Sequence, residues 1–382
     1  MQFKDIIGHV AVKERLINTV RENRVSHAQL FLGPEGSGSL ALALAYAQFI
    51  NCLDKQESDS CGVCTSCRKY ARIIHPDLHF SYPFFAKHKD DTAADYISDW
   101  RNCFLNNPYL DLECWRNQLN AENKQANINI AEAHHIIKKL SLKAYEAEYK
   151  VLIMWLPEFL DSQGNALLKL IEEPPAKTLF LLVAENPDKL LSTIISRTQL
   201  VKVSRPGNDE VAAYLMEVGH VQEQQARQAA FISEGNVQRA LNLLNEEHSD
   251  HFELLVQWLR YCVTDSGLSL IDFSEDILVK MGRENQKSFI LYAISMMRQV
   301  LLCKAGAEAL MRLSGAEKGF AEKFAGLYTE KQLDNAVEVF EKAHYHIERN
   351  ANGKILFLDV SLQLVLNFKY ATFRREADST YL

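Results

Sequence analysis

Short apolar runs alternate with helical patterns through about the first two hundred residues of the chain. Five runs have the length and composition typical of buried strands, at 28–33, 77–82, 150–155, 178–184 and 199–203. Helical patterns lie between them at 39–51, 131–144 and 161–173, and the last ends at Pro174-Pro175, as a helix should. Strands that alternate with helices predict a parallel sheet covered on both faces, so this part of the chain belongs to the α/β class.

Residues 84–127 interrupt this alternation with charged, aromatic and Asn-rich sequence. A structureless loop of that length is unusual inside a compact domain. We therefore interpret the segment as an insertion with helices of its own, to which the sequence assigns no role.

After Arg205-Pro206-Gly207 the strand pattern stops and helical periodicity takes over. Two or three short helices are expected within 208–245. Longer amphipathic helices are expected within 250–372, separated near Gly267, Gly282, Gly306 and Gly353. The expected organisation is an α/β domain at 1–205, a small helical domain at 206–246 and an all-α C-terminal domain at 247–382.

Composition narrows the class of protein. The chain has 382 residues, enough for two or three cores, and its 47% hydrophobic and 24% charged residues are ordinary for a globular protein. No apolar run reaches the roughly 18 residues of a membrane span, and no apolar signal segment opens the chain, so we expect a cytoplasmic protein. The net charge of −7 argues against extensive wrapping of nucleic acid, although a local basic patch is compatible with it.

Four of the eight cysteines, Cys52, Cys61, Cys64 and Cys67, lie within sixteen residues. In a chain of this length without a secretory signal, such clustering favours metal binding over disulfides. The two-residue spacings let cysteines of one tight turn converge on a single ion. Four thiolates complete a tetrahedral shell, so we predict a structural zinc site at about 52–67 with no open position for catalysis. His75 and His79 follow this module, and we interpret both as ordinary polar residues flanking a strand.

The segment GPEGSGSLA at 33–41 follows the first predicted strand and opens a helix. It approximates the pattern G-x-x-x-x-G-K-[ST], in which backbone N–H groups and a lysine bind phosphates. Gly33, Gly36 and Gly38 supply such a loop, but Ser39 stands at the lysine position and Leu40 at the Ser/Thr position. The segment is either a degraded nucleotide loop or a glycine-rich turn that binds nothing.

Hydrolysis of a nucleotide also needs an acid after a later strand to hold magnesium and a second acid to position water. Trp155, Leu156 and Pro157 stand where the first acid belongs. Glu158 and Asp161 are nearby, and we interpret both as exposed residues at the start of the next helix. We therefore expect no intrinsic ATPase activity and binding of ATP or ADP that is absent or weak.

Ser196 and Arg197 stand just before the last predicted strand, on a rim of the sheet. Arg197 is either a surface arginine paired with a carboxylate or an arginine finger that reaches the nucleotide of a neighbouring subunit. Arg239, near the start of a helix after Gly235-Asn236, either faces the same cleft as the glycine loop or is a solvated helix residue, and taken alone it is interpreted as the latter.

The chain resembles the bacterial DNA polymerase III clamp loader family of the AAA+ class, most closely its delta-prime subunits. The resemblance rests on the cysteine module and on DIIGHVAVKERLINTVRENRVSHAQLFLGPEGSG, HPDLHF, GNALLKLIEEPPAKTLFLLVAENPDKLLSTIISRTQ and EGNVQRAL. It covers about the first 240 residues, whereas the C-terminal helices resemble the family's collar only in length and helicity.

The resemblance implies a stator that need not hydrolyse ATP and whose Ser-Arg motif, here Ser196 and Arg197, faces the ATP site of an adjacent motor subunit. Thr198 replaces the cysteine usual in that motif. The implied partners are delta and gamma/tau subunits in a hetero-pentameric ring, a sliding clamp and primer-template DNA. The helices at 206–246 and 247–382 would be lid and collar. Two alternatives stay open: an active AAA+ ATPase, and a zinc-stabilised DNA-binding protein outside any clamp loader.

Overall fold

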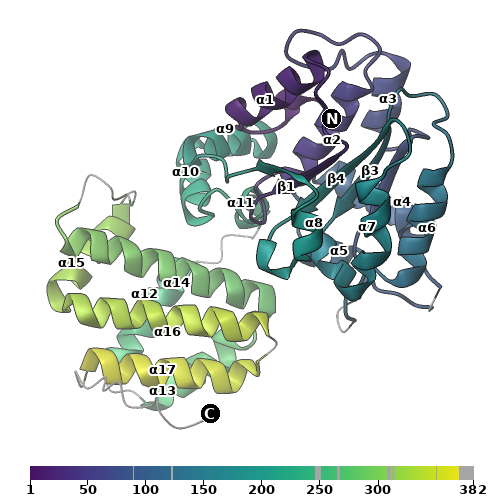
Figure 1. The fold of residues 1–382 in the computed structure, drawn as a ribbon. Helices are drawn as coiled ribbons and strands as arrows, with labels where there is room; N and C mark the ends of the chain where they lie inside the picture. Colours follow the sequence, from purple (N-terminus) through teal and green to yellow (C-terminus); the bar gives the residue numbers. More distant parts are fainter. Residues whose placement is uncertain are drawn as a thin grey trace. The chain divides into compact units, whose positions relative to one another are not determined.

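The structure is a computed structural model that describes residues 1–88, 90–121, 124–245, 251–264, 267–307, 311, 313, 315–349 and 351–369. It divides into two compact units, Met1–Asn242 and Leu243–Leu382. The first unit holds a sheet and its covering helices, and the second is helical throughout its described residues (Figure 1). The expected boundary between residues 246 and 247 lies outside the described residues.

A five-stranded sheet in the order β2-β3-β4-β1-β5 forms the centre of the first unit. Its strands are β1 (Ala28–Leu32), β2 (Leu78–Ser81), β3 (Lys150–Trp155), β4 (Thr178–Ala184) and β5 (Gln199–Lys202). The four pairings between them are parallel, and in the register Leu30 of β1 lies between Leu182 of β4 and Leu200 of β5. The predicted strands are confirmed, because nearly continuous apolar runs are typical of parallel strands buried on both faces.

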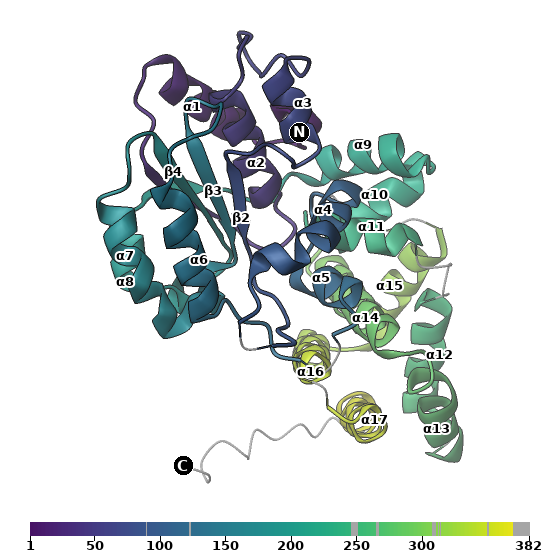
Figure 2. The same ribbon diagram turned by 90° about the vertical axis from the view of Figure 1, so that its right-hand side faces the viewer.

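Helices cover both faces of this sheet (Figures 1 and 2). One core joins α1 (Val10–Arg21), α2 (Ser39–Ile50) and α3 (Thr65–Ala71) to one face. A second core joins α6 (Ile130–Ser141), α7 (Asn165–Glu172) and α8 (Ser192–Ile195) to the other. Val151 and Ile153 of β3 face the first core and Leu152 and Met154 the second, as the two-residue period of a strand requires. Short 3-10 helices also lie at Phe3–Asp5 and Pro187–Lys189.

The insertion has the helices that were expected of it: a 3-10 helix at Ala93–Tyr96, α4 (Ile97–Asn106) and α5 (Leu112–Gln118). Residues 89, 122 and 123 of the insertion lie outside the described residues. Its described part packs on the core that contains α2, where Trp100 and Trp115 are fully buried.

Two helices differ in extent from the prediction. The helix expected at 161–173 is a 3-10 helix at Pro157–Gly164 followed by α7, because Gly164 disfavours a continuous α-helix. The helix expected at 131–144 is α6, which begins after Asn129, where the Asn129 side chain accepts the N–H of Glu132 at 2.8 Å.

The remaining helices follow the expected order. In the first unit the chain forms α9 (Asn208–Gly219) and α10 (Glu223–Ile232), and α11 (Val237–Asn245) follows. The second unit contains α12 (His251–Val263), α13 (Gly267–Phe273), a π-helix at Ser274–Leu278, α14 (Arg283–Lys304), α15 (Gly315–Leu327), α16 (Glu330–Glu348) and α17 (Gly353–Lys369). Its core includes buried Trp258, whose Nε1 donates to Ser361 Oγ at 2.9 Å. None of the helices in the described residues is both long and apolar enough to span a bilayer.

Candidate functional site

The four clustered cysteines converge in space. The Sγ atoms of Cys52, Cys61, Cys64 and Cys67 all lie within 4.8 Å of one another, and those of Cys61 and Cys67 are 4.0 Å apart. A tetrahedron with Zn–S bonds of about 2.3 Å has Sγ–Sγ edges of roughly 3.8 Å, so the cluster fits a metal of that kind. The four-cysteine cluster can therefore hold a metal ion such as zinc.

Backbone N–H groups point at the sulfur atoms of this cluster. Cys52 Sγ accepts the N–H of Cys61 at 3.3 Å, Cys61 Sγ that of Cys64 at 3.3 Å, and Cys64 Sγ that of Cys67 at 3.4 Å. Burial alone would raise the pKa of Cys64, but the N–H donors of Cys67 and Leu53 and the neighbouring thiols lower it to about 7. Donors of this kind stabilise the thiolate form that a metal requires.

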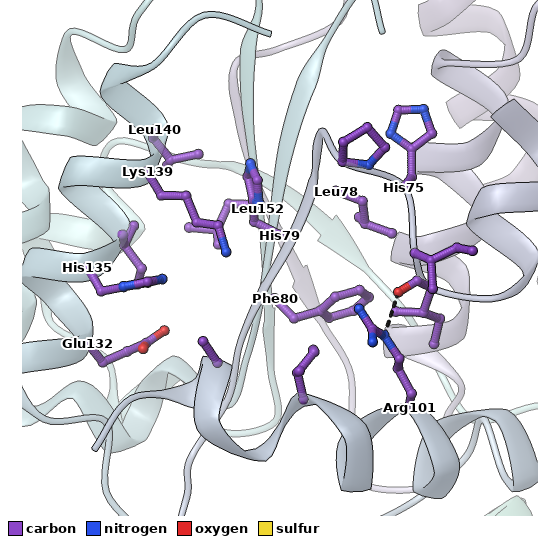
Figure 3. A pocket seen from close by; sticks show the side chains of 16 residues that line it. His75, Leu78, His79, Phe80, Arg101, Glu132, His135, Lys139, Leu140 and Leu152 are labelled. Carbon is purple, nitrogen blue, oxygen red and sulfur yellow. Dashed lines mark hydrogen bonds between the residues drawn. The ribbon is translucent and has the colours of Figure 1, made fainter. Parts of the chain in front are cut away.

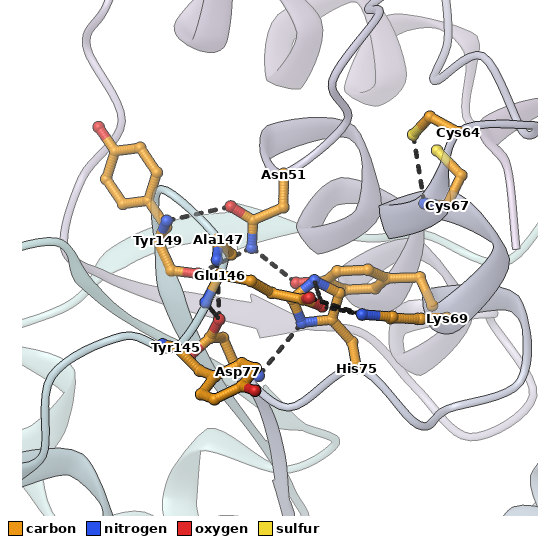
Figure 4. Close-up of polar contacts among 11 residues, drawn as sticks. Asn51, Cys64, Cys67, Lys69, His75, Asp77, Tyr145, Glu146, Ala147 and Tyr149 are labelled. Atoms are coloured by element: carbon orange, nitrogen blue, oxygen red, sulfur yellow. Dashed lines mark hydrogen bonds and ion pairs between the residues drawn. The ribbon is translucent and has the colours of Figure 1, made fainter.

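A buried carboxylate, Asp77, fixes the strand that follows the cysteine module (Figure 4). Its oxygens accept the backbone N–H groups of Tyr145, Glu146 and Ala147 at 2.6, 2.8 and 2.8 Å. Burial alone would raise the pKa of Asp77, but these three hydrogen bonds and His75 hold it below its ordinary value. Asp77 is therefore a structural residue, one that the sequence analysis missed within HPDLHF.

His75 precedes β2, as expected, and it is buried. Its Nδ1 accepts the N–H of Asp77 at 3.1 Å, and its Nε2 lies 3.4 Å from Glu146 Oε1. Both ring nitrogens thus have partners within the chain. Among the described residues the four cysteines alone form a group that could hold a metal, which agrees with the exclusion of His75 and His79 as ligands.

The glycine loop joins β1 to α2. Gly36 and Gly38 have φ angles of +71° and +85°, and α2 begins directly afterwards at Ser39. Ser39 is buried, and its Oγ lies 2.8 Å from Ser37 Oγ. The residue at the lysine position thus bonds within the loop itself.

Protein atoms surround each of the three glycines. A Cβ at Gly33 would lie 2.5 Å from Val203 O, one at Gly36 would lie 1.9 Å from Asn236 Oδ1, and one at Gly38 would lie 2.8 Å from a ring carbon of Tyr109. The glycines are therefore needed for close packing against the end of β5, the start of α11 and the insertion.

The start of α11 is bonded to the glycine loop. The N–H of Val237 donates to Gly36 O at 3.1 Å, and Asn236 Nδ2 donates to Glu35 Oε1 at 3.2 Å. Asn236 Oδ1 also accepts the N–H of Arg239 at 3.0 Å, which caps the helix. Arg239 is half-buried at the start of this helix.

Glu158 is also not the exposed residue that the sequence suggested. It is half-buried, and its Oε1 accepts the N–H groups of Glu185 and Asn186 at 2.6 and 2.9 Å, directly after β4. The position after β3 is taken by Leu156, which is buried and has a φ of +53°. The side chain of Asp161 lies outside the described residues. Glu158 thus accepts hydrogen bonds from the backbone directly after β4.

Acidic side chains gather at the same edge of the sheet as the glycine loop. Burial, followed by Glu35, Glu158 and Asp111, raises the pKa of Glu185 to about 8, and Lys189 lowers it only in part. A triphosphate carries several negative charges, so this environment opposes its binding where no lysine compensates.

We expect Glu185→Gln to reduce the pH dependence of stability. Between its ordinary pKa of 4.5 and its folded-state pKa of about 8, Glu185 keeps a proton in the folded chain that the unfolded chain releases. The wild type therefore loses stability as the pH rises through this window. We expect the variant to be more stable by up to about 4 to 5 kcal/mol at pH 8.5 and to match the wild type near pH 4.5, as measured by denaturant unfolding. A difference that is the same at both pH values, or one shared by exposed Glu173→Gln, would contradict this account.

Arg197 is exposed and held in place by its own chain. Its Nε donates to Glu172 Oε1 across a short hydrogen bond, and its Nη1 donates to Thr193 O at 2.9 Å and to Ser196 Oγ at 3.3 Å. Among the described residues Nη2 has no hydrogen-bond partner. Arg197 thus forms the surface ion pair that one of its two interpretations expected. Its acidic partner is Glu172, which the sequence analysis missed.

Arg197 and the glycine loop lie at opposite edges of the sheet. The loop follows the carboxyl end of β1, whereas Arg197 precedes the amino end of β5, and Gln29 pairs in parallel with Gln199. A strand of four residues spans about 13 Å. Arg197 therefore lies away from the loop of its own chain, and the structure does not bring these two predicted sites together.

A hollow of about 260 Å³ lies over the edge strand β2, lined by residues of α4 and α6 (Figure 3). Arg101 and Lys139 enter it from these two helices, and Glu132, His79 and His135 also line it. Burial, with a further effect of Lys139, lowers the pKa of His79 to about 4, so its ring is neutral at pH 7. The hollow has groups of both charges and none of the predicted nucleotide, metal or finger residues.

Comparison with known proteins gives the family. The family model described as DNA polymerase III, delta subunit, matches residues 8–207. The subunit delta' of Escherichia coli is 26% identical over 253 residues, 65% of this chain and 64% of that protein, and the subunit delta' of Haemophilus influenzae is 24% identical over 359 residues, 93% and 95%. The subunit tau of Bacillus subtilis is 22% identical over 380 residues, 93% of this chain and 60% of that protein. The chain thus spans less than two thirds of the tau and Escherichia coli relatives. Because the family model covers more than half of the chain, the chain belongs to the delta-prime subunits of the DNA polymerase III clamp loader family.

Proposed function

We propose that this chain is a stator subunit of a DNA polymerase III clamp loader and helps to load a sliding clamp on primed DNA. The observation that carries the proposal is the placement of Arg197, which is exposed at the sheet edge opposite the glycine loop. An arginine there can reach a nucleotide only on another subunit, where it would act as a finger beside Ser196. The partners would be delta and gamma/tau subunits in a hetero-pentameric ring, the sliding clamp and primer-template DNA.

The glycine loop supports a subunit without ATPase activity of its own. Ser39 replaces the lysine, Leu156 replaces the magnesium-binding acid, and Asn236 and Tyr109 pack against the loop. An active AAA+ ATPase is the alternative, and the similarity to a tau subunit keeps it relevant. Without the lysine and the acid, neither the phosphate charge nor a magnesium ion has its usual protein partner.

The other parts of the chain would have structural roles. The four-cysteine cluster would hold a zinc ion with no open coordination position, because its four thiolates fill the tetrahedral shell. Within the first unit, α9 to α11 would form the lid, and the helices from α12 onward the collar that joins the ring. We further propose that the protein acts in the cytoplasm.

Reconstitution tests the proposed place in a clamp loader. The purified chain, mixed with delta and gamma/tau subunits from the same source, should elute with them in gel filtration as one complex. Elution of the chain apart from the other subunits at micromolar concentration would contradict the proposal.

Nucleotide and DNA binding by the isolated chain separate the stator from its alternatives. We expect no ATP turnover and no saturable binding at micromolar ATP, with or without magnesium. Turnover would establish the ATPase alternative instead. Tight, steeply salt-dependent binding of DNA by the isolated chain would favour a DNA-binding protein.

A further inference from the structure

The insertion contacts the lid through Asn107, at the end of α4. Its Nδ2 donates to Gln238 Oε1 of α11 across a short hydrogen bond, and Gln238 Nε2 donates to Cys114 Sγ of α5 at 2.8 Å. Gln238 Nε2 also donates to Asn242 Oδ1 at 3.1 Å within α11. Because Gln238 is 3% exposed, loss of Asn107 would leave the buried amide oxygen without a partner. The insertion thus binds both the oxygen and the nitrogen of one lid side chain.

Tyr109, also in the insertion, lies between the glycine loop and the lid. Its ring lies against Gly38 and is 5.7 Å, centroid to centroid, from the ring of Tyr214 in α9. Its hydroxyl accepts the N–H of Ile7 at 2.9 Å, and its backbone N–H donates to Asn107 Oδ1 at 3.0 Å. Only 2% of Tyr109 is exposed. One buried ring therefore joins the start of the chain, the glycine loop and α9.

An aromatic cluster fixes the insertion to the sheet. Trp100 stacks on Tyr82 with ring centroids 4.1 Å apart, and it lies 5.3 Å from Trp115 and 5.2 Å from Trp155 of β3. Trp115 Nε1 donates to the carbonyl oxygen of Pro83 at 2.7 Å. Fully buried aromatic pairs of this kind add to the stability that burial provides. Asn107 and Tyr109 thus project from a rigid base.

We propose that the insertion is a brace, meaning a structural element that positions the lid. It holds α9 and α11 against the glycine loop without any nucleotide. Asn107 and Tyr109 are its positioning residues. A ligand bound at such a loop could connect the loop to the lid. Here the chain's own side chains, Asn107 and Tyr109, make that connection. This proposal is independent of the stator role, because it concerns contacts within the first unit alone.

Hydrogen exchange on the full chain tests whether the insertion positions the lid. Asn107→Ala and Tyr109→Ala should each raise amide exchange in residues 237–242 by about tenfold or more, while β3 and β4 keep wild-type protection. Tyr109→Phe keeps the ring contacts and should have a smaller effect. Exposed Asn106→Ala and Tyr145→Ala are the matched controls and should leave the lid unchanged.

Two results would overturn the proposal. One is lid exchange in Asn107→Ala no faster than in Asn106→Ala, and the other is an equal rise across the lid, β3 and β4, which would indicate a general loss of stability. If Tyr109→Ala does not fold, Asn107→Ala and Tyr109→Phe decide the question. A double-mutant cycle adds a second readout, in which Asn107→Ala and Gln238→Ala together should speed lid exchange by less than the product of their separate factors.

Discussion

Arg197→Ala in a reconstituted clamp loader is expected to reduce ATP hydrolysis at the site facing it by about 10³-fold or more. An arginine finger stabilises the charge that develops on the transferred phosphoryl group, and no other group replaces it once the guanidinium is gone. Arg197 is exposed, with Nε bound to Glu172 and Nη1 to Thr193 O, so hydrogen bonds within its own chain hold the side chain before any partner arrives. The measurement is single-turnover ATP hydrolysis by the complex with clamp and primed DNA.

Two further variants make this result specific. Arg197→Lys retains the charge but loses the planar fork, so it should recover only a small part of the rate. Arg72→Ala removes an exposed arginine from the end of α3 and should leave the rate unchanged. If the Arg197→Ala complex assembles and hydrolyses ATP at the wild-type rate at every site, the finger assignment is wrong.

The elements of the α/β unit could be predicted because each depends on local sequence. The run at 178–184 is apolar at nearly every position, which is typical of a strand buried on both faces, and β4 has those bounds. The cysteine spacing likewise predicted that the four side chains lie close together, and the distances between their Sγ atoms confirm this prediction. A local pattern therefore sufficed wherever the partners were near in sequence or the pattern was strongly periodic.

The surroundings of the glycine loop could not be predicted because they come from distant parts of the chain. Asn236 reaches Gly36 from two hundred residues further along, and Tyr109 reaches Gly38 from the insertion. No periodicity connects such positions. Glu158 shows the same limit, because an acid after a proline is normally exposed, yet the free N–H groups after β4 bind it. Sequence reasoning singled out the three glycines but not the protein atoms that pack against them.

Removal of the metal is expected to destabilise the first unit by at least about 3 kcal/mol, because a structural zinc ion contributes its binding free energy to folding. Cys67→Ala deletes a fully buried thiol of the four-cysteine cluster, near the start of α3. The loss should extend to the start of the chain, since Asp59 of the same module accepts the N–H groups of Phe3 and Lys4 at 3.1 and 3.0 Å. Denaturant unfolding would measure the change in free energy, and metal analysis the loss of zinc.

The control for this experiment is Cys103→Ala, which removes a cysteine of α4 outside the cluster and should keep the metal. A strong chelator added to the wild type should reproduce the Cys67→Ala result, including faster hydrogen exchange at Phe3 and Lys4. The site assignment is wrong if protein purified without chelator holds well under one equivalent of zinc. It is equally wrong if Cys67→Ala retains as much zinc as Cys103→Ala, because the zinc content would then not depend on the Cys67 sulfur.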